Sequence, residues 1–301
     1  MDSLCDRCNQ EACCFEIDVP DPHAFCGLVC QTAFRGQMQL IFSDCAQKLR
    51  RYRLLGELGL GREGIVFSCG TSRGEFALKV VKQSKSSVTE VLAASRLSRM
   101  TGFIDFYDYW ICDTVPLGDP VLANAIQSRQ SAKEKQPRNR EEWNNRDLLD
   151  TMAHPPHCYM VMQKAVGTMK SLRQARVLTR NEQWQFLFEM IYALNREFKA
   201  QGFAHNDATS ENILYVLEEP RSYTLVDGRE IQCQSQFRPL WADFSTATFG
   251  NQKHGDDYII YMDMVGWHDG ISDIEHFRTY RPYQDDVNYD RWLIAIAEKF
   301  Q

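Results

Sequence analysis

The sequence has little of what a membrane protein or a nucleic-acid-binding protein needs. No apolar run approaches the length of a membrane-spanning helix, and the first ten residues, MDSLCDRCNQ, lack the apolar centre of a signal peptide. The net charge of −6 leaves no basic surplus for general binding to a phosphate backbone. We therefore expect a protein with no membrane span, no strong nucleic-acid signal and a cytoplasmic location.

What the sequence does contain is typical of globular proteins. Hydrophobic residues make up 44% and charged residues 25%, and 301 residues suffice for one large domain or for two to three small ones. Cysteine is plentiful, with eleven residues. In a reducing compartment we expect these cysteines to be thiols or metal ligands rather than disulfides.

Six of the cysteines lie within the first thirty residues, which show no long periodic run. Cys5 and Cys8 form C-x2-C, and Cys26 and Cys30 form C-x3-C at a point where a helix would begin. The segment resembles treble-clef-like zinc fingers, in which thiolates on Zn²⁺ stabilise a core too small to fold alone. The alternative is a set of small buried thiols. Three other residues could replace one ligand: Cys13, Cys14 and His23.

The character of the sequence changes near residue 48, where KLRRYRLL begins. We therefore divide the chain into a zinc-binding module, residues 1–47, and a larger domain, residues 48–301. One insertion, at about 113–157, is poor in apolar residues, and we expect it to be flexible or partly helical. A second insertion, at about 216–238, predicts a hairpin that turns at Asp227 and Gly228.

Residues 54–70, LLGELGLGREGIVFSCG, place Gly59, Gly61 and Gly64 at G-x-G-x-x-G spacing. Such glycines let backbone amides approach an anionic group closely, because no side chain stands in the way. A dinucleotide-binding fold needs a helix directly after the glycines, whereas IVFSC is β-branched and aromatic. The stretch therefore predicts a hairpin folded over phosphates.

The strand predicted at residues 76–81 carries Lys79 among valines and other apolar residues. A lysine in an alternating strand often faces solvent. The helix predicted at residues 87–100 carries Glu90, eleven residues after the lysine, and a buried lysine needs a carboxylate partner to stay charged. We therefore expect an ion pair between Lys79 and Glu90.

The clearest helix begins after Thr179, which forms a capping box with Glu182. It leads into FAHNDATSEN, a polar loop that holds His205, Asp207 and Asn212. An Asx turn after a helix would explain this loop without any chemistry. The helix also carries an apolar stripe that we expect to be core: Trp184, Leu187, Phe188, Ile191, Leu194 and Phe198.

Another acid, Asp243, ends the apolar strand in PLWADF and could bind a metal or cap a turn. In order, the chain holds a glycine loop, a strand lysine, a helix glutamate, an H-x-D-x-x-x-x-N loop and a strand-end Asp-Phe. Over about residues 50–301 this order resembles the eukaryotic-type protein kinases. The resemblance implies an α+β, two-lobed protein-kinase-like fold, with a β-rich N-lobe and a shortened helical C-lobe after the zinc-binding module.

The resemblance also implies a role for each polar residue. Lys79, fixed by Glu90, would hold the α- and β-phosphates of ATP. Asp207 would accept the proton of the substrate hydroxyl, and Asn212 and Asp243 would hold Mg²⁺. The implied activity is transfer of the γ-phosphate of ATP to protein hydroxyls, with ATP, Mg²⁺ and Zn²⁺ as cofactors.

Further residues are implied to contact the nucleotide. The glycine loop would cover the ATP phosphates, Met162 would lie beside the adenine, and residues 163–165 would form the hinge between the lobes. The implied nucleotide contacts are Gly59, Gly61, Gly64, Val66, Ala77, Lys79, Met162, Gln163, Ala165, Asn212 and Asp243.

A narrower resemblance rests on HNDATSENILYV, on the hairpin before the Asp-Phe pair and on Gly167-Thr168. These features are similar to the Ser/Thr kinases of large cytoplasmic DNA viruses. This resemblance implies a location in the host cytoplasm or the virion. It also implies protein substrates, and virion or host proteins that dock on the zinc-binding module.

Four features depart from the kinase pattern. Asn206 stands where kinases have arginine, Thr209 where Ser/Thr kinases have lysine, and Ser245 where the D-F-G glycine is expected; no A-P-E motif follows. Asp263 is a weak match to the buried aspartate that braces the catalytic loop. These departures leave two alternatives open: a pseudokinase that acts as a binding or virion-structural protein, and a small-molecule phosphotransferase.

The cysteine spacing predicts that purified protein carries about one zinc per chain. Elemental analysis of protein purified without chelator tests this expectation. The double variant Cys26→Ser, Cys30→Ser should lose the metal, because two of four thiolate ligands are removed. Metal-free wild-type protein, or a double variant with full metal content, would contradict the assignment.

Overall fold

The computed structural model describes residues 45–60, 64–112, 156–250 and 289–301. The chain forms two compact units. Unit 1 contains Met1–Arg96 and Asp105–Lys164, and unit 2 contains Leu97–Ile104 and Ala165–Gln301. The predicted zinc ligands, Gly61, most of the insertion at 113–157 and Asp263 lie outside the described residues. The expected division at 47/48 falls within the helix α2, Cys45–Arg51.

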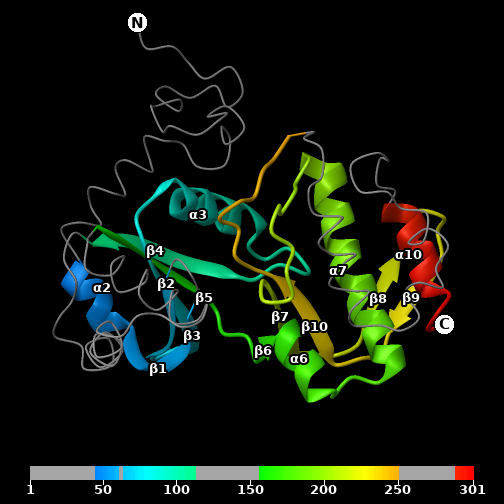
Figure 1. Ribbon diagram of the computed structural model, residues 1–301, viewed down its shortest axis with the longest axis horizontal. Helices are drawn as coiled ribbons and strands as arrows, with labels where there is room; N and C mark the ends of the chain where they lie inside the picture. The colour runs from blue at the N-terminus through cyan, green and yellow to red at the C-terminus, as the bar shows by residue number, and fades with distance from the viewer. Residues whose placement is uncertain (1–44, 61–63, 113–155, 251–288) are drawn as a thin grey trace, which may run out of the picture. The chain divides into compact units, whose positions relative to one another are not determined.

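Unit 1 is built on a five-stranded antiparallel sheet of order β1-β2-β3-β5-β4 (Figure 1). The apolar residues of these strands form one core cluster, in which Trp110 stacks between Tyr52 and Tyr159 at centroid distances of 5.4 and 5.3 Å. The helix α3 spans Lys85–Leu97. The strands are β1 (Arg53–Leu60), β2 (Gly64–Thr71), β3 (Gly74–Lys82), β4 (Phe106–Cys112) and β5 (His157–Gln163).

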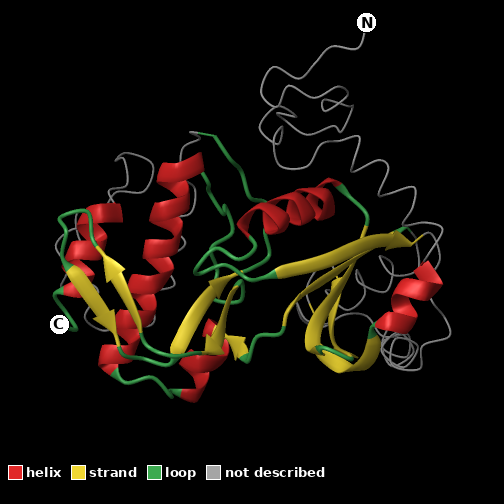
Figure 2. Cartoon of the chain, turned by 180° about the vertical axis from the view of Figure 1, so that it is seen from behind, coloured by secondary structure: helices red, strands yellow, loops and turns green. Residues whose placement is uncertain are grey.

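Unit 2 combines helices with short strands (Figure 2). Its strands form a three-stranded sheet of order β10-β7-β6 and a separate hairpin of β8 and β9. The expected turn of this hairpin is confirmed, since Gly228 has φ +84° between the two strands. The elements are β6 (Gly167–Thr168), α6 (Met169–Ala175), α7 (Arg180–Gln201), β7 (Ile213–Leu217), β8 (Arg221–Thr224), β9 (Glu230–Cys233), β10 (Phe237–Trp241) and α10 (Tyr289–Ala297).

The helix α7 is the centre of unit 2, and α10 packs along it (Figure 1). The expected capping box of Thr179 and Glu182 is present, and Gly202 ends the helix in the left-handed conformation. The predicted apolar stripe is buried except for Phe198, which is half-buried. Polar residues on the other faces of α7 are also buried, so the helix is enclosed on more sides than its stripe predicts: Gln185, Glu189, Asn195 and Glu197. No helix in the described part of the chain is long and apolar enough to cross a membrane.

Gly102 lets the segment after α3 approach α7 and β10. Its φ is +87°, and a Cβ at this position would lie 2.4 Å from the Cβ of Ala193 in α7. The carbonyl of Gly102 accepts from the N–H of Trp241 at 2.8 Å, and the N–H of Ile104 donates to the carbonyl of Trp241 at 3.0 Å. This close approach fixes the end of β10, the strand that leads to Asp243.

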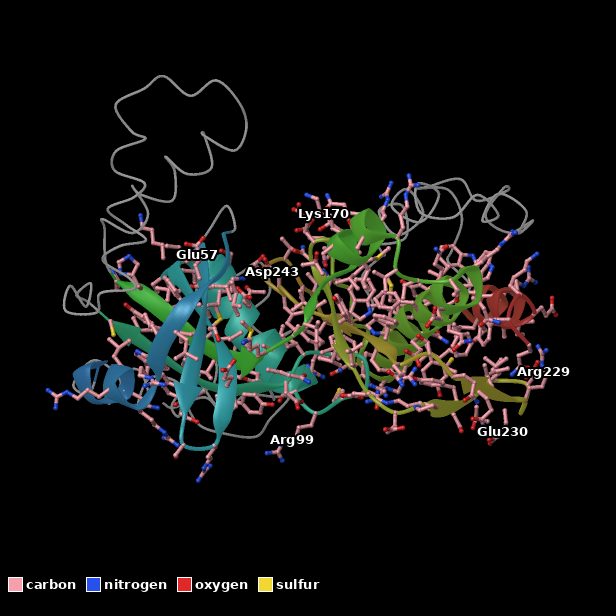
Figure 3. The ribbon with its side chains drawn as sticks, turned by 90° about the horizontal axis from the view of Figure 1, so that it is seen from below. Glu57, Arg99, Lys170, Arg229, Glu230 and Asp243 are labelled. Atoms are coloured by element: carbon pink, nitrogen blue, oxygen red, sulfur yellow. The ribbon has the colours of Figure 1, made fainter. Side chains whose placement is uncertain are left out.

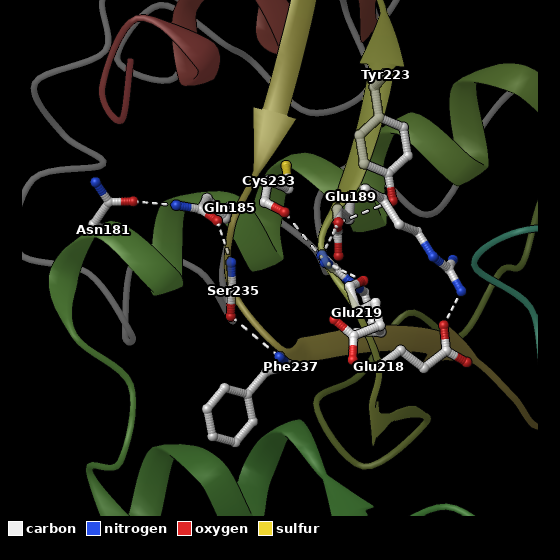
Figure 4. Close-up of polar contacts among 11 residues, drawn as sticks. Asn181, Gln185, Glu189, Glu218, Glu219, Tyr223, Cys233, Ser235 and Phe237 are labelled. Carbon is white, nitrogen blue, oxygen red and sulfur yellow. Dashed lines mark hydrogen bonds and ion pairs between the residues drawn. The ribbon is translucent and has the colours of Figure 1, made fainter.

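A buried polar network attaches the β8–β9 hairpin to α7 (Figure 4). The guanidinium of Arg238 pairs with the carboxylate of Glu189, and both side chains are almost fully buried. The same carboxylate accepts from the Tyr223 hydroxyl at 2.9 Å, while Arg238 also donates to the carbonyls of Glu219 and Cys233. Burial raises the pKa of Glu189, and the charge of Arg238 offsets only part of this rise, so the pKa is about 7.

Glu189→Ala should therefore destabilise the protein by about 3–5 kcal/mol, because it removes the acceptor shared by the buried Arg238 guanidinium and the Tyr223 hydroxyl and leaves a cavity. Denaturant unfolding measures the loss. The matched control is Glu230→Ala, the same chemical change at an exposed carboxylate of the hairpin (Figure 3). This control should cost less than about 1 kcal/mol. Equal costs for the two variants would contradict the structural role of the network.

Candidate functional site

The predicted ion pair between Lys79 and Glu90 is present in unit 1. Lys79 Nζ lies 2.6 Å from Glu90 Oε1, and the two side chains are 12% and 2% exposed. Lys79 comes from β3 and Glu90 from the middle of α3, so the pair joins the helix to the sheet. A carboxylate with so little solvent stabilises the ammonium as a fixed positive charge, which is what phosphate oxygens require.

The strand register places four of the predicted nucleotide contacts, all in unit 1, on one face of the sheet. Val66 pairs with Lys79 across β2 and β3, and Ala77 pairs with Met162 across β3 and β5. Lys79 and Ala77 are two residues apart, so their side chains point to the same face. The opposite face carries core residues such as Leu78, which is fully buried. Four of the expected contacts therefore line one surface, with the charge of Lys79 among them.

The two described glycines of the predicted loop have different structural roles. A Cβ at Gly59 would meet nothing within 4 Å. A Cβ at Gly64 would lie 2.2 Å from the carbonyl oxygen of Val80 in β3, so the sheet itself requires glycine there. Gly61 lies outside the described residues. Gly59 therefore has open space beside it for a ligand, whereas Gly64 is needed for the pairing of β2 with β3.

The predicted hinge coincides with the boundary between the units. Unit 1 ends at Lys164 and unit 2 begins at Ala165. Gln163 is the last residue of β5, and its N–H donates to the carbonyl of Asp105 at 2.8 Å. Lys164 pairs with Glu75 of β3 at 2.5 Å, so its side chain is directed back onto the sheet of unit 1.

In unit 2 the loop after α7 brings Asp207 and Asn212 into contact. The amide nitrogen of Asn212 donates to Asp207 Oδ2 at 2.8 Å and to the Asp207 carbonyl at 2.9 Å. The N–H of Thr209 also donates to that carbonyl, at 2.9 Å, which tightens the loop. Because the nitrogen of Asn212 faces Asp207, its amide oxygen is the atom that could coordinate a cation.

His205 links the two acidic segments of unit 2. Its Nδ1 accepts from the N–H of Asp207 at 3.3 Å, so its Nε2 carries the proton and donates to the carbonyl of Ala242 at 2.9 Å. The ring is fully buried among aromatic neighbours that include Trp241 and Phe244. Burial lowers the pKa of His205, so the imidazole is neutral at physiological pH.

Asp243 follows β10 in a left-handed conformation, with φ +60°. The preceding residue, Ala242, donates its N–H to the carbonyl of Asn212 at 3.0 Å, which places Asn212 and Asp243 at adjacent ends of β7 and β10. Asp207 and Asp243 both act electrostatically on the ring of His205. An amide oxygen and carboxylates are the hard oxygen ligands that Mg²⁺ prefers, so the residues fit this cation.

The candidate residues therefore form two sets, one in each unit. Lys79, with Glu90, lies in unit 1, while Asp207, Asn212 and Asp243 lie together in unit 2. No group of three or more His, Cys, Asp and Glu side chains suited to a metal occurs within the described ranges. The sequence did not predict the role of two threonines after Asp243, Thr246 and Thr248. Both contact Asn206, and no local pattern indicates these contacts.

Among the comparisons with known proteins, only the comparison with solved structures finds matches. No protein-family model matches the chain, and no curated protein matches it. Solved structures do match, among them the crystal structure of a kinase domain with 17% sequence identity and a TM-score of 0.41. The match covers 68% of this chain and 54% of that one, so this chain spans about half of the kinase-domain chain. We therefore base the functional proposal on the residues themselves.

The buried, neutral His205 predicts a loss of stability in mild acid. The unfolded chain takes up a proton near the ordinary pKa of 6.5, whereas the folded pKa is lower. The stabilisation is thus present above pH 6.5 and is lost as the pH falls below it. We expect this residue to lower the free energy of unfolding by up to about 1.4 kcal/mol per pH unit between pH 6.5 and 5.5. Urea unfolding measures the slope.

Glu189 changes the stability with pH in the opposite direction. The contribution of His205 is therefore the difference in slope between wild type and a His205 variant. Its raised pKa means that folding takes up a proton there, which stabilises the fold as the pH falls from about 7. His205→Gln leaves this contribution in place and removes only the imidazole. If wild type and His205→Gln have the same slope, His205 is not held neutral.

Proposed function

We propose that the protein transfers the γ-phosphate of ATP to serine and threonine hydroxyls of other proteins. The observation that carries the proposal is the contact between Asn212 and Asp207. The Asn212 amide holds the Asp207 carboxylate by a hydrogen bond of 2.8 Å and leaves its own oxygen for a cation. A carboxylate fixed beside a cation ligand is the arrangement that phosphoryl transfer to a hydroxyl requires.

Asp207 acts on the incoming hydroxyl. Its carboxylate accepts a hydrogen bond from the hydroxyl and orients the oxygen toward the γ-phosphorus. The new bond joins that oxygen to phosphorus, the bond from phosphorus to the bridging oxygen breaks, and ADP leaves with the bond's electrons. The hydroxyl proton passes to Asp207. Because Asn212 and His205 each bind a different part of Asp207, the acid needs little reorganisation when the substrate arrives.

Lys79 supplies a positive charge for the phosphate oxygens. The buried Glu90 carboxylate fixes the direction of the ammonium, and the surface that carries Val66, Ala77 and Met162 is apolar enough to take a purine. Asn212 and Asp243 would hold Mg²⁺, which neutralises charge on the phosphates. The chain's own part is to present these groups in fixed orientations.

The finer assignments rest on the resemblance to kinases of large cytoplasmic DNA viruses. They comprise Ser/Thr specificity, a place in the virion or the host cytoplasm, and docking of protein partners through the zinc-binding module. The alternative is a pseudokinase that binds nucleotide without transfer. Thr209 and Ser245, which stand where kinases have a phosphate-binding lysine and the D-F-G glycine, favour that alternative.

Two isosteric variants separate an enzyme from a pseudokinase. Asp207→Asn keeps the shape of the loop and should lower phosphotransfer by about 10²–10⁴, because the general base is lost, while Mg·ATP binding stays close to wild type. Asp243→Asn should weaken both, because a divalent cation needs a full negative charge. Transfer of labelled phosphate from ATP and binding of Mg·ATP by calorimetry give the two readouts.

The control is Glu230→Gln, which changes an exposed carboxylate of β9 in unit 2 (Figure 3). It should alter neither phosphotransfer nor binding. A wild-type protein that binds Mg·ATP yet phosphorylates neither itself nor a generic protein substrate would establish the pseudokinase instead. If Asp207→Asn retains full transfer, Asp207 is not the base.

A further inference from the structure

Asn206 occupies a central place between the two acidic segments of unit 2. Its amide nitrogen donates to the carbonyl of Thr246 at 3.0 Å and to the hydroxyl of Thr248 at 3.0 Å. A longer contact of 3.5 Å reaches the carbonyl of Ala204. Asn206 precedes Asp207 directly, and Thr246 follows Asp243 by three residues. One side chain thus spans the chain segments that carry both acids.

Further hydrogen bonds reinforce this contact. The hydroxyl of Thr246 donates to the carbonyl of His205 at 3.0 Å. Ala204 and Thr248 exchange two backbone hydrogen bonds, each of 2.9 Å, and the N–H of Gly250 donates to the carbonyl of Gln201 at 3.0 Å. The segment 244–250 therefore lies along residues 201–206 through contacts made only by neutral groups. We call Asn206, Thr246 and Thr248 the neutral clamp.

The backbone of Asn206 explains why asparagine suits this position. Its φ is +65°, in the left-handed region, where asparagine is accommodated more readily than other residues with a Cβ. The amide has two N–H donors, and each finds an acceptor at 3.0 Å on the facing segment. A β-branched or apolar residue would meet backbone strain and would leave the carbonyl of Thr246 without this donor.

We propose that Asn206 is a positioning residue for phosphotransfer: the neutral clamp sets the spacing between the carboxylates of Asp207 and Asp243. The inference rests on the proposed function. It assigns to Asn206 no contact with substrate or nucleotide. Asn206 acts through Asp207, to which it is joined by one peptide bond, and through the segment that begins at Asp243. Loss of the clamp misplaces the base relative to the cation ligand and slows transfer more than it weakens binding.

The test uses Asn206→Gly, which permits the same positive φ and removes the side chain with its amide. We expect kcat to fall about 10- to 100-fold while KM for ATP changes less than about twofold, because the base is misplaced and the nucleotide contacts remain. Thr248→Val removes one acceptor and should give a smaller fall in kcat. Phosphotransfer from ATP to a generic protein substrate, with the full-length chain, measures both constants.

The control is Glu211→Gln, in the same loop as Asp207. Glu211 is exposed and pairs with Lys170 of α6, outside the neutral clamp. Figure 3 labels Lys170. This variant should keep kcat and KM. Similar changes of kcat and KM in Asn206→Gly, together with a lower melting temperature, would show a merely structural role and overturn the proposal. So would an unchanged kcat.

A readout that does not depend on activity separates the clamp from the proposed function. The amides of Ala204 and Thr248 should lose protection from hydrogen exchange in Asn206→Gly and keep it in Glu211→Gln. Unchanged protection in Asn206→Gly overturns the clamp whatever the activity. Wild-type protein that transfers no phosphate overturns the proposed function and the positioning role with it, while lost protection in Asn206→Gly would still establish the clamp.

Discussion

One neutral imidazole, that of His205, is the constraint on which the candidate site of unit 2 depends. Its ring accepts from the backbone of Asp207 on one side and donates to the carbonyl before Asp243 on the other. This pattern needs a single tautomer, and the aromatic residues around the ring exclude the water that would favour a second proton. The same packing thus fixes the protonation of the ring and the direction of both acidic segments.

Local signals explain what the sequence could predict. The capping box at Thr179, the turn at Gly228 and the apolar stripe of α7 each depend on residues close together in the chain, and the structure contains all three. The pair of Lys79 and Glu90 was also predicted, because a lysine in an apolar strand needs a partner and one acid lies on the next helix. The roles of these residues in phosphotransfer stay proposals.

Contacts between distant segments explain what the sequence could not predict. Nothing near Glu189 in the chain indicates that it meets Arg238, 49 residues later, in a buried pair. The sequence does not distinguish Gly59 from Gly64. Of the two, only Gly64 lies against a backbone that leaves no room for a side chain. In the sequence, Asn206 stands out because kinases have arginine at this position. Its hydrogen-bond partners in the structure lie about 40 residues away in the chain.

The position of α10 has a consequence for the order in which the protein folds. Asn195 of α7 hydrogen-bonds Asp290 of α10 at 2.8 Å across 95 residues of chain, whereas the first three strands of unit 1 pair as consecutive hairpins. Closing long loops costs entropy before any contact rewards it. During synthesis, the β1–β2–β3 meander can therefore form early, while α7 keeps an uncovered face until α10 has been made. In that interval the face of α7 that α10 later covers is open to a chaperone.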